Sequence, residues 1–363
     1  MSPREPSHAV EDSHVEYLTR SRFTSLDGLR AVSIVPVVWH HANPVAPDGL
    51  LGKGAAGVAL FFAISGYLIT TLLLRERRRS ATGGIGLVDF YRRRARRIFP
   101  LYYLVLAGHA AWALILASNS PVARHFLKAL PWHATYTANW FVDYGVPHPV
   151  MFTFGWSLCV EEQFYLGWPP VLRFVRGRAA PALAMFAAIA LDFAVEHRML
   201  GLAWPPGAVR VVSSFAAPIG LGALVALVLD HPLGYRWAHT LARNAAAAPL
   251  ALLAVVAMLL VDGVPLVVFD AALALLVMTL VVAPRSGLDR VLNHPVALHV
   301  GLVSYGVYLL HVPALALARA GLRALLATPP SPWMVFLIGL PLAIGAATLA
   351  HRYVERPFLR RSA

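Results

Sequence analysis

The stretch Ser25-Leu26-Asp27-Gly28-Leu29-Arg30, which runs on through an apolar segment to Trp39-His40-His41, decides how this chain can fold. Ser25 and Asp27 can accept hydrogen bonds from the free backbone N–H groups of a helix start, so the stretch predicts a helix. Arg30 and His41 stand about three helical turns apart, or roughly 16 Å at 1.5 Å per residue. If this helix crosses a bilayer, the two side chains lie at different depths. Ionisable groups inside a membrane are costly and usually serve a function.

The composition indicates an integral membrane protein of many spans. Of the 363 residues, 58% are hydrophobic and 13% are charged, and the mean hydropathy is +0.63. Soluble domains are about half apolar and about a quarter charged, so this chain has too few charges to cover a globule of its size. Its net charge of +13 comes mostly from arginines between apolar segments, which favours anionic head groups over nucleic acid as partners. Cys159 is the only cysteine, so the sequence holds no disulfide framework and no cysteine zinc site.

Because a span needs about 20 mostly apolar residues, we predict an all-α polytopic membrane helical bundle of about ten transmembrane helices. The expected spans lie near residues 27–43, 55–74, 98–117, 153–174, 181–197, 207–229, 245–261, 265–283, 296–318 and 333–352.

The distribution of basic residues predicts the orientation. If the N-terminus is cytoplasmic and the spans alternate, the cytoplasmic segments hold 24 of the 31 Lys and Arg residues and the outer segments hold 7. This matches the positive-inside rule and predicts a multi-pass protein of the cell's inner (plasma) membrane with both termini in the cytoplasm. Residues 1–22 form a polar cytoplasmic tail without the apolar core of a signal peptide, so the first span directs insertion. Residues 23–357 form the membrane domain, and residues 358–363 form a short basic cytoplasmic tail.

The longest predicted outer segment runs from Ser118 to Phe152 and is rich in aromatic and small polar residues, Trp132, Trp140 and Phe141 among them. It can cover a site or contact an acceptor. Its rings can equally form an aromatic belt at the membrane interface.

The histidine pair gives the first candidate for chemistry. Neighbours on a helix point about 100° apart, so His40 and His41 cannot face the same partner. An imidazole here can hydrogen-bond to a neighbouring helix, or it can act as a general base, because it exchanges protons near neutral pH. A zinc site is disfavoured, since adjacent residues do not make a ligand face.

Arginines are the second candidate group. Five of them, Arg92, Arg93, Arg94, Arg96 and Arg97, fall within six residues and lead directly into a span. At helical spacing Arg93, Arg94 and Arg97 share a face, and planar guanidinium groups suit phosphate recognition. A cytoplasmic nucleotide or coenzyme can reach this face, and anionic lipid competes for it. For the arginines of residues 75–79, orientation in the membrane is a sufficient explanation.

Two further motifs are polar inside apolar runs. Ser65-Gly66-Tyr67 either lets helices approach closely or opens a helix beside a wet cavity. Glu161 and Glu162 cannot face lipid at acceptable cost, so they orient an imidazole, bind an acceptor hydroxyl or pair with an arginine. His311, which precedes Pro313, and Glu355 are interpreted as structural, the first at a kink and the second paired to a basic neighbour.

Taken together and in this order, the motifs resemble the integral membrane acyltransferase-3 family over about residues 23–357. Members of that family O-acylate sugars of surface polysaccharides, and some acylate antibiotics such as macrolides. Its first motif is an arginine, ten residues and a histidine, which Arg30 and His41 satisfy and which selects His41 over His40. The other matching runs are Phe-Phe-x-x-Ser-Gly-Tyr, Phe-Tyr-x-Arg-Arg-x-x-Arg-Ile-x-Pro-Leu-Tyr, Trp-Ser-Leu-x-Val-Glu-Glu-Gln-Phe-Tyr and Ser-Tyr-x-x-Tyr-Leu-x-His-x-Pro. Ala59 replaces a common aspartate, and we expect no C-terminal esterase-like domain of the kind many relatives carry.

The resemblance implies acyl transfer from acyl-coenzyme A, usually acetyl-coenzyme A, to a hydroxyl of a carbohydrate or glycosylated small-molecule acceptor, without a metal. His41 would remove the acceptor proton or briefly carry the acyl group, and Arg30 would hold the donor or stabilise charge at the thioester carbonyl. The implied catalytic residues are His41, Arg30, Glu161 and Glu162. The implied donor-binding residues are Arg92, Arg93, Arg94, Arg97, Ser65, Gly66 and Tyr67.

Two other classes of protein remain open from the residues alone. A transporter or flippase for a glycan or lipid would also use buried Arg, His and Glu, for proton coupling. A lipid-binding structural protein would explain the arginines but leaves His41, Glu161 and Glu162 without a role.

Overall fold

The computed structural model describes residues 6–43, 53–81, 83–115, 117, 119–144, 151–175, 177, 179–201, 205–212, 214–215, 217–283 and 285–360. Parts of both predicted tails and of the loop at residues 118–152 therefore lie outside the described residues.

The described residues form helices and no strands, which confirms the all-α class. In chain order the helices are α1 (Pro6–Thr19), α2 (Thr24–Ala42), α3 (Ala55–Arg79), α4 (Leu87–Ile115), α5 (Pro121–Ala134), α6 (Ala138–Phe141), α7 (Gly155–Phe174), α8 (Ala179–Glu196), α9 (Pro206–Val212), α10 (Ala217–Asp230), α11 (Pro232–Ala242), α12 (Ala247–Leu260), α13 (Leu266–Val282), α14 (Asp289–Leu292), α15 (Pro295–Leu302), α16 (Ser304–Leu325), α17 (Pro332–Ala350), the π-helical turn η2 (His351–Glu355) and α18 (Arg356–Arg360).

Each predicted span coincides with helix, but the count of about ten spans is not confirmed. Within the described residues, six helices are long and apolar enough to cross a membrane, or seven if α11 and α12, bent by 79°, make one span. The short helices α12 and α13 have 14 and 17 residues, fewer than the roughly 20 that a span needs. α2 and α7 are longer but carry charged and imidazole side chains, which lower their hydropathy.

The chain divides into two compact units. Unit 1 comprises Met1–Gly84 and Ala217–Thr348, and unit 2 comprises Ile85–Ala216 and Leu349–Ala363. His41 and Arg30 therefore belong to unit 1, whereas the arginines of residues 92–97 and the glutamate pair belong to unit 2.

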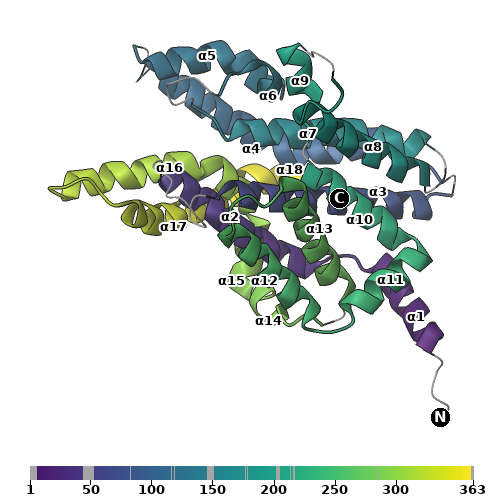
Figure 1. Cartoon of the computed structure of the whole chain (residues 1–363). Helices are drawn as coiled ribbons and strands as arrows, with labels where there is room; N and C mark the ends of the chain where they lie inside the picture. The colour runs from purple at the N-terminus through teal and green to yellow at the C-terminus, as the bar shows by residue number, and fades with distance from the viewer. Residues whose placement is uncertain are drawn as a thin grey trace. The chain divides into compact units, whose positions relative to one another are not determined.

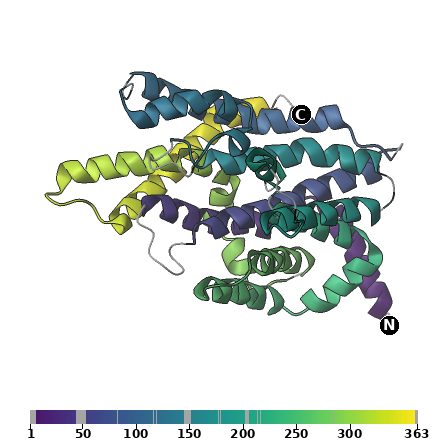
Figure 2. The ribbon, with the colours of Figure 1, turned by 45° about the horizontal axis from the view of Figure 1, so that its top comes forward.

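The core of unit 1 is built on the packing of α3 against α10 and α2 (Figures 1 and 2). A Cβ atom at Gly66 would collide with the carbonyl oxygen of Ile219, and one at Gly222 would collide with that of Ala63. Two glycines thus allow the α3 and α10 backbones to touch, as small residues do between membrane helices. α3 continues without a break through Gly66, so of the two interpretations of Ser65-Gly66 the contacts favour close packing.

In unit 2, hydrogen bonds fix the loop helices α5 and α6 to α4 and α7. Tyr102 Oη donates to the carbonyl oxygen of His133 at 2.7 Å at the end of α5. Gln163 on α7 and Asn139 on α6 exchange two amide hydrogen bonds of 2.9 and 3.1 Å. At the C-terminal end of this unit, Glu355 pairs with His351 at 2.8 Å, which confirms its predicted structural pairing with a basic neighbour.

Candidate active site

His41 lies half-buried in the last turn of α2, while His40 next to it is exposed. The Nδ1 atom of His41 is 2.9 Å from the carbonyl oxygen of Val37. A carbonyl oxygen only accepts hydrogen bonds, so this contact assigns the proton to Nδ1 and leaves the Nε2 lone pair available. The geometry therefore gives His41 the tautomer that a general base or a nucleophile at Nε2 needs.

The side chain against His41 is His311 from α16. The two ring centres are 4.6 Å apart and the planes make an angle of 75°, an edge-to-face contact. His311 is fully buried, and its Nδ1 donates to the carbonyl oxygen of Tyr308 at 2.6 Å. The sequence motif predicts a structural role for His311 at a kink and does not by itself predict this contact. The signal that could have found it is its place in the fifth family-like motif, two residues before Pro313.

α16 also holds the end of α2 at which His41 stands. Arg319 donates to the carbonyl oxygen of Ala42 at 3.0 Å. A cation beside the last carbonyl groups of a helix satisfies acceptors that have no partner within the helix and complements the helix dipole. His311 and Arg319 together therefore fix the position of the His41 backbone and ring.

Arg30 lies on the same helix as His41 but not beside it. The eleven-residue separation corresponds to about 16 Å along the axis, more than an arginine side chain can reach. Its carbonyl oxygen accepts a hydrogen bond of 2.8 Å from Ser33 Oγ. The catalytic role of Arg30 stays a prediction.

In unit 2, the predicted arginine and glutamate motifs come together. The Cζ atom of Arg94 lies 5.7 Å from the centres of both the Phe90 and the Tyr165 rings, within cation–π range. Tyr165 Oη donates to Glu161 Oε1, and the charge of Arg94 acts on Glu162. α4 and α7 thus join a guanidinium, a phenol and two carboxylates in one cluster, in which a glutamate and an arginine are neighbours.

The other arginines of the run are more open. Arg93 and Arg97 are exposed, as is Arg92, which pairs with Asp89 at 3.6 Å. These side chains are accessible to an anionic ligand, and their assignment to donor binding stays a prediction.

Ser65, Gly66 and Tyr67 have packing contacts in unit 1. Ser65 is 2% exposed, and Gly66 lies against the α10 backbone. Tyr67 is fully buried, and its hydroxyl is 3.0 Å from that of Tyr17 on α1. Their predicted role in donor binding remains a prediction as well.

A groove of about 450 Å³ opens between α6 and α9 in unit 2. Trp140 and Phe141 line it on the α6 side, and Trp140 Nε1 donates to Ser214 Oγ at 2.9 Å. The α9 side is lined by Gly207, Ala208, Arg210, Val211 and Val212. Both helices lie in or beside segments that the topology predicts to face outward.

His133, near the end of α5, is fully buried, and its ring nitrogens make no hydrogen bond with any described residue. Burial lowers the pKa of His133 to about 4, and the neighbouring His109 and His125 act in the same direction. The ring is therefore neutral near pH 7 and serves as part of the aromatic core of the loop.

A family model described as an acyltransferase domain matches residues 23–352. The chain belongs to this acyltransferase-3 family. The membership confirms the resemblance seen in the sequence motifs, and it confirms the predicted enzyme class, an acyltransferase for groups other than amino-acyl groups.

The curated relatives carry related names. The acyltransferase domain is 26% identical to a peptidoglycan O-acetyltransferase of Listeria monocytogenes, over 93% of this chain and 56% of the relative. It is 27% identical to a Bacillus subtilis protein provisionally named for the same activity, over 92% of this chain and 54% of that protein. The chain thus spans about half the length of the curated relatives it matches. No solved structure matches it.

The chain is a multi-pass membrane protein, because it has several helices long and apolar enough to cross a membrane and belongs to a family of membrane acyltransferases. The family implies an acyl donor. In the part of the chain that the structure describes, no three His, Cys, Asp or Glu side chains group as metal ligands.

Proposed function

We propose that the chain is a membrane O-acyltransferase that moves an acyl group from acyl-coenzyme A to a hydroxyl of a sugar or glycosylated acceptor. The observation that carries this proposal is the His41 imidazole, oriented by Val37 and His311 within a chain of the acyltransferase family. Acetyl-coenzyme A is the proposed donor, because the relatives are named O-acetyltransferases. We place the protein in the cell's inner membrane with both termini in the cytoplasm, as its arginine distribution predicts.

In the proposed reaction His41 Nε2 takes the proton of the acceptor hydroxyl. The acceptor oxygen attacks the thioester carbonyl, the C–S bond breaks, and the leaving thiolate takes the proton back from the imidazolium. In the alternative route Nε2 itself attacks the thioester carbonyl, and the C–S bond breaks so that coenzyme A leaves as the thiolate. The acceptor oxygen then attacks the acyl-histidine, the N–C bond breaks, and the hydroxyl proton goes to the thiolate. Arg30 is assigned to the donor or to the negative charge that develops on the carbonyl oxygen.

Donor binding is assigned to Arg93, Arg94 and Arg97, with Arg92 beside them. We expect Arg94→Gln to weaken coenzyme A binding by roughly tenfold to a hundredfold, because a hydrogen bond to a charged group contributes about 1.5–3 kcal/mol. Calorimetric titration of the purified protein with coenzyme A measures this. Arg360→Gln, which removes an exposed charge from α18 of the same unit, is the matched control.

If Arg94→Gln and Arg360→Gln bound coenzyme A with equal affinity, the assignment of Arg94 to donor binding would be wrong. Protection of Arg93 or Arg94 from an arginine-modifying reagent by coenzyme A would separate an enzyme from a transporter, which has no reason to bind the donor.

The α6–α9 groove is the proposed entry point of the acceptor. An indole and a phenyl ring present flat apolar faces to a sugar ring, and Arg210 can bind a carboxylate on the glycan.

We expect Trp140→Ala to raise the KM for soluble peptidoglycan fragments several-fold with kcat nearly unchanged, because the ring would bind the acceptor equally in the ground state and the transition state. Steady-state kinetics measure this, with Trp237→Ala on α11, an exposed tryptophan of unit 1 that does not line the groove, as the control. A wild-type KM in Trp140→Ala would place the acceptor elsewhere.

A further inference from the structure

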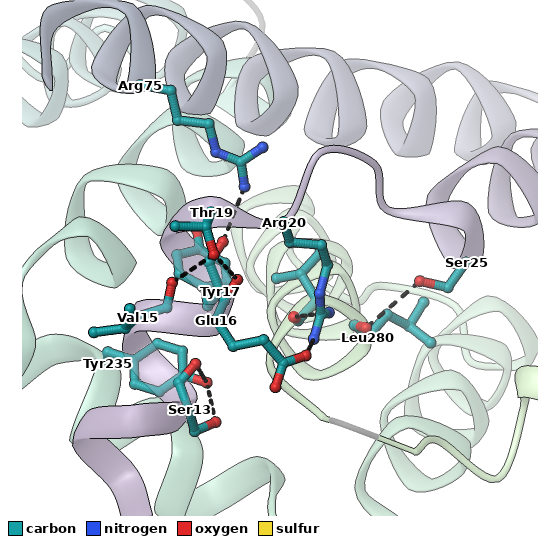
Figure 3. Close-up of polar contacts among 11 residues, drawn as sticks. Ser13, Val15, Glu16, Tyr17, Thr19, Arg20, Ser25, Arg75, Tyr235 and Leu280 are labelled. Atoms are coloured by element: carbon teal, nitrogen blue, oxygen red, sulfur yellow. Dashed lines mark hydrogen bonds and ion pairs between the residues drawn. The ribbon is translucent and has the colours of Figure 1, made fainter. Parts of the chain in front are cut away.

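Unit 1 contains a buried arginine for which orientation in the membrane is not a sufficient explanation. Arg75, near the end of α3, is only 7% exposed. One of its terminal nitrogens donates to the carbonyl oxygen of Tyr17 at 3.0 Å, and its Nε atom is buried without a hydrogen-bond partner. Figure 3 shows the guanidinium pointing from α3 toward the C-terminal half of α1. Among the described residues no carboxylate lies within ion-pair distance of Arg75, and an uncompensated buried charge is costly.

Two more arginines add to this charge. The guanidinium carbons of Arg75 and Arg20 lie 5.1 and 5.6 Å from the centre of the same Phe23 ring. The charge of Arg79, one turn further along α3, also acts on Arg75. Glu16 pairs with Arg20 at 3.2 Å, but its side chain is 72% exposed, so water screens its charge. The charges of Arg20 and Arg79 thus both act on the buried Arg75, and among the described residues the one carboxylate paired within this group is the exposed Glu16.

Two of the three arginines are accessible to solvent. Arg79 is exposed and Arg20 is partly exposed, whereas Arg75 is buried. An anion that reaches Arg79 and Arg20 would relieve the repulsion among all three charges. Tyr17 on α1 and Arg20, just after the end of α1, precede residue 23, at which the match to the family model begins.

We propose that Arg20, Arg75 and Arg79 form a binding site for a phosphate-bearing ligand, made of other residues than the arginines of residues 92–97. Guanidinium groups bind phosphate oxygens through paired, charge-assisted hydrogen bonds. The phosphate belongs either to a nucleotide such as the acyl donor or to the head group of an anionic phospholipid. Both are present at the cytoplasmic face, where the topology predicts this end of α3.

The test measures binding by the purified full-length chain. Coenzyme A is titrated into protein held in zwitterionic lipid nanodiscs, and phosphatidylglycerol retained from mixed-lipid nanodiscs is measured by native mass spectrometry. We expect Arg75→Gln and Arg79→Gln each to weaken the binding of one of these two probes by about tenfold, which corresponds to about 1.4 kcal/mol. Arg75→Lys, which keeps the charge, should retain most of the binding. Arg243→Gln, which removes an exposed arginine of unit 1, should bind like the wild type.

Loss of coenzyme A binding identifies the nucleotide as the source of the phosphate, and loss of phosphatidylglycerol identifies the lipid. If Arg75→Gln fails to fold, the exposed Arg79→Gln gives the answer. Unchanged binding of both probes in Arg79→Gln overturns the site. The readout is binding rather than acyl transfer, so its outcome is independent of the role proposed for His41.

Discussion

We expect His41→Ala to lower the rate of acyl transfer by at least about a hundredfold to ten-thousandfold, since a positioned general base contributes that much. The loss would be larger if His41 also carries the acyl group. His40→Ala is a closely matched control, because His40 is the neighbouring residue of the same type but is exposed. The measurement is transfer of labelled acetyl from acetyl-coenzyme A to the acceptor by equal amounts of membrane-inserted protein.

The same assay separates the two chemical routes. Without acceptor, a covalent route leaves label on wild-type protein and none on His41→Ala, whereas direct transfer leaves label on neither. Wild-type activity in His41→Ala would refute the assignment of His41. Equal losses in His40→Ala and His41→Ala would show that the end of α2 had been disrupted, and that neither ring had a specific role.

The sequence predicts the helical class, which the structure confirms, and it selects His41, whose role stays a prediction, but it does not predict the environment of His41. The motif of an arginine, ten residues and a histidine selects His41 over His40, and the structure places the two residues differently, one against His311 and the other exposed. The contact with His311 joins residues 270 positions apart. No local pattern encodes such a contact, because it depends on how α16 packs against α2.

The number of spans shows a different limit. Hydropathy identifies apolar segments, and each of them is helical here. It does not reveal whether an apolar segment forms one straight helix, since turns such as that between α11 and α12 depend on tertiary packing. The polar residues that lower the hydropathy of α2 and α7 include Arg30, His41, Glu161 and Glu162, so the residues proposed for chemistry also weaken the membrane signal there.

A second large effect is expected at Gly66, and it concerns stability. Gly66→Val would place a branched side chain against the carbonyl oxygen of Ile219, where backbone meets backbone and neither helix can yield cheaply. Overpacking of this kind typically costs about 1–3 kcal/mol and sometimes more. We therefore expect a marked fall in the thermal midpoint of unfolding in detergent and in the amount of folded protein. Gly222→Val, which separates the same two helices from the α10 side, should act alike, and the double variant should cost less than the sum.

Gly345→Val provides the matched control, because a Cβ atom there on α17 meets nothing within 4 Å. This variant should unfold near the wild-type temperature. The comparison also decides between the two interpretations of the Ser65-Gly66-Tyr67 motif. If Gly66→Val unfolds at the wild-type temperature but loses affinity for coenzyme A, the glycine serves the donor and the packing explanation is wrong. If it is destabilised in parallel with Gly222→Val, the glycine is required because the α3 and α10 backbones touch, and the donor must be bound by other residues.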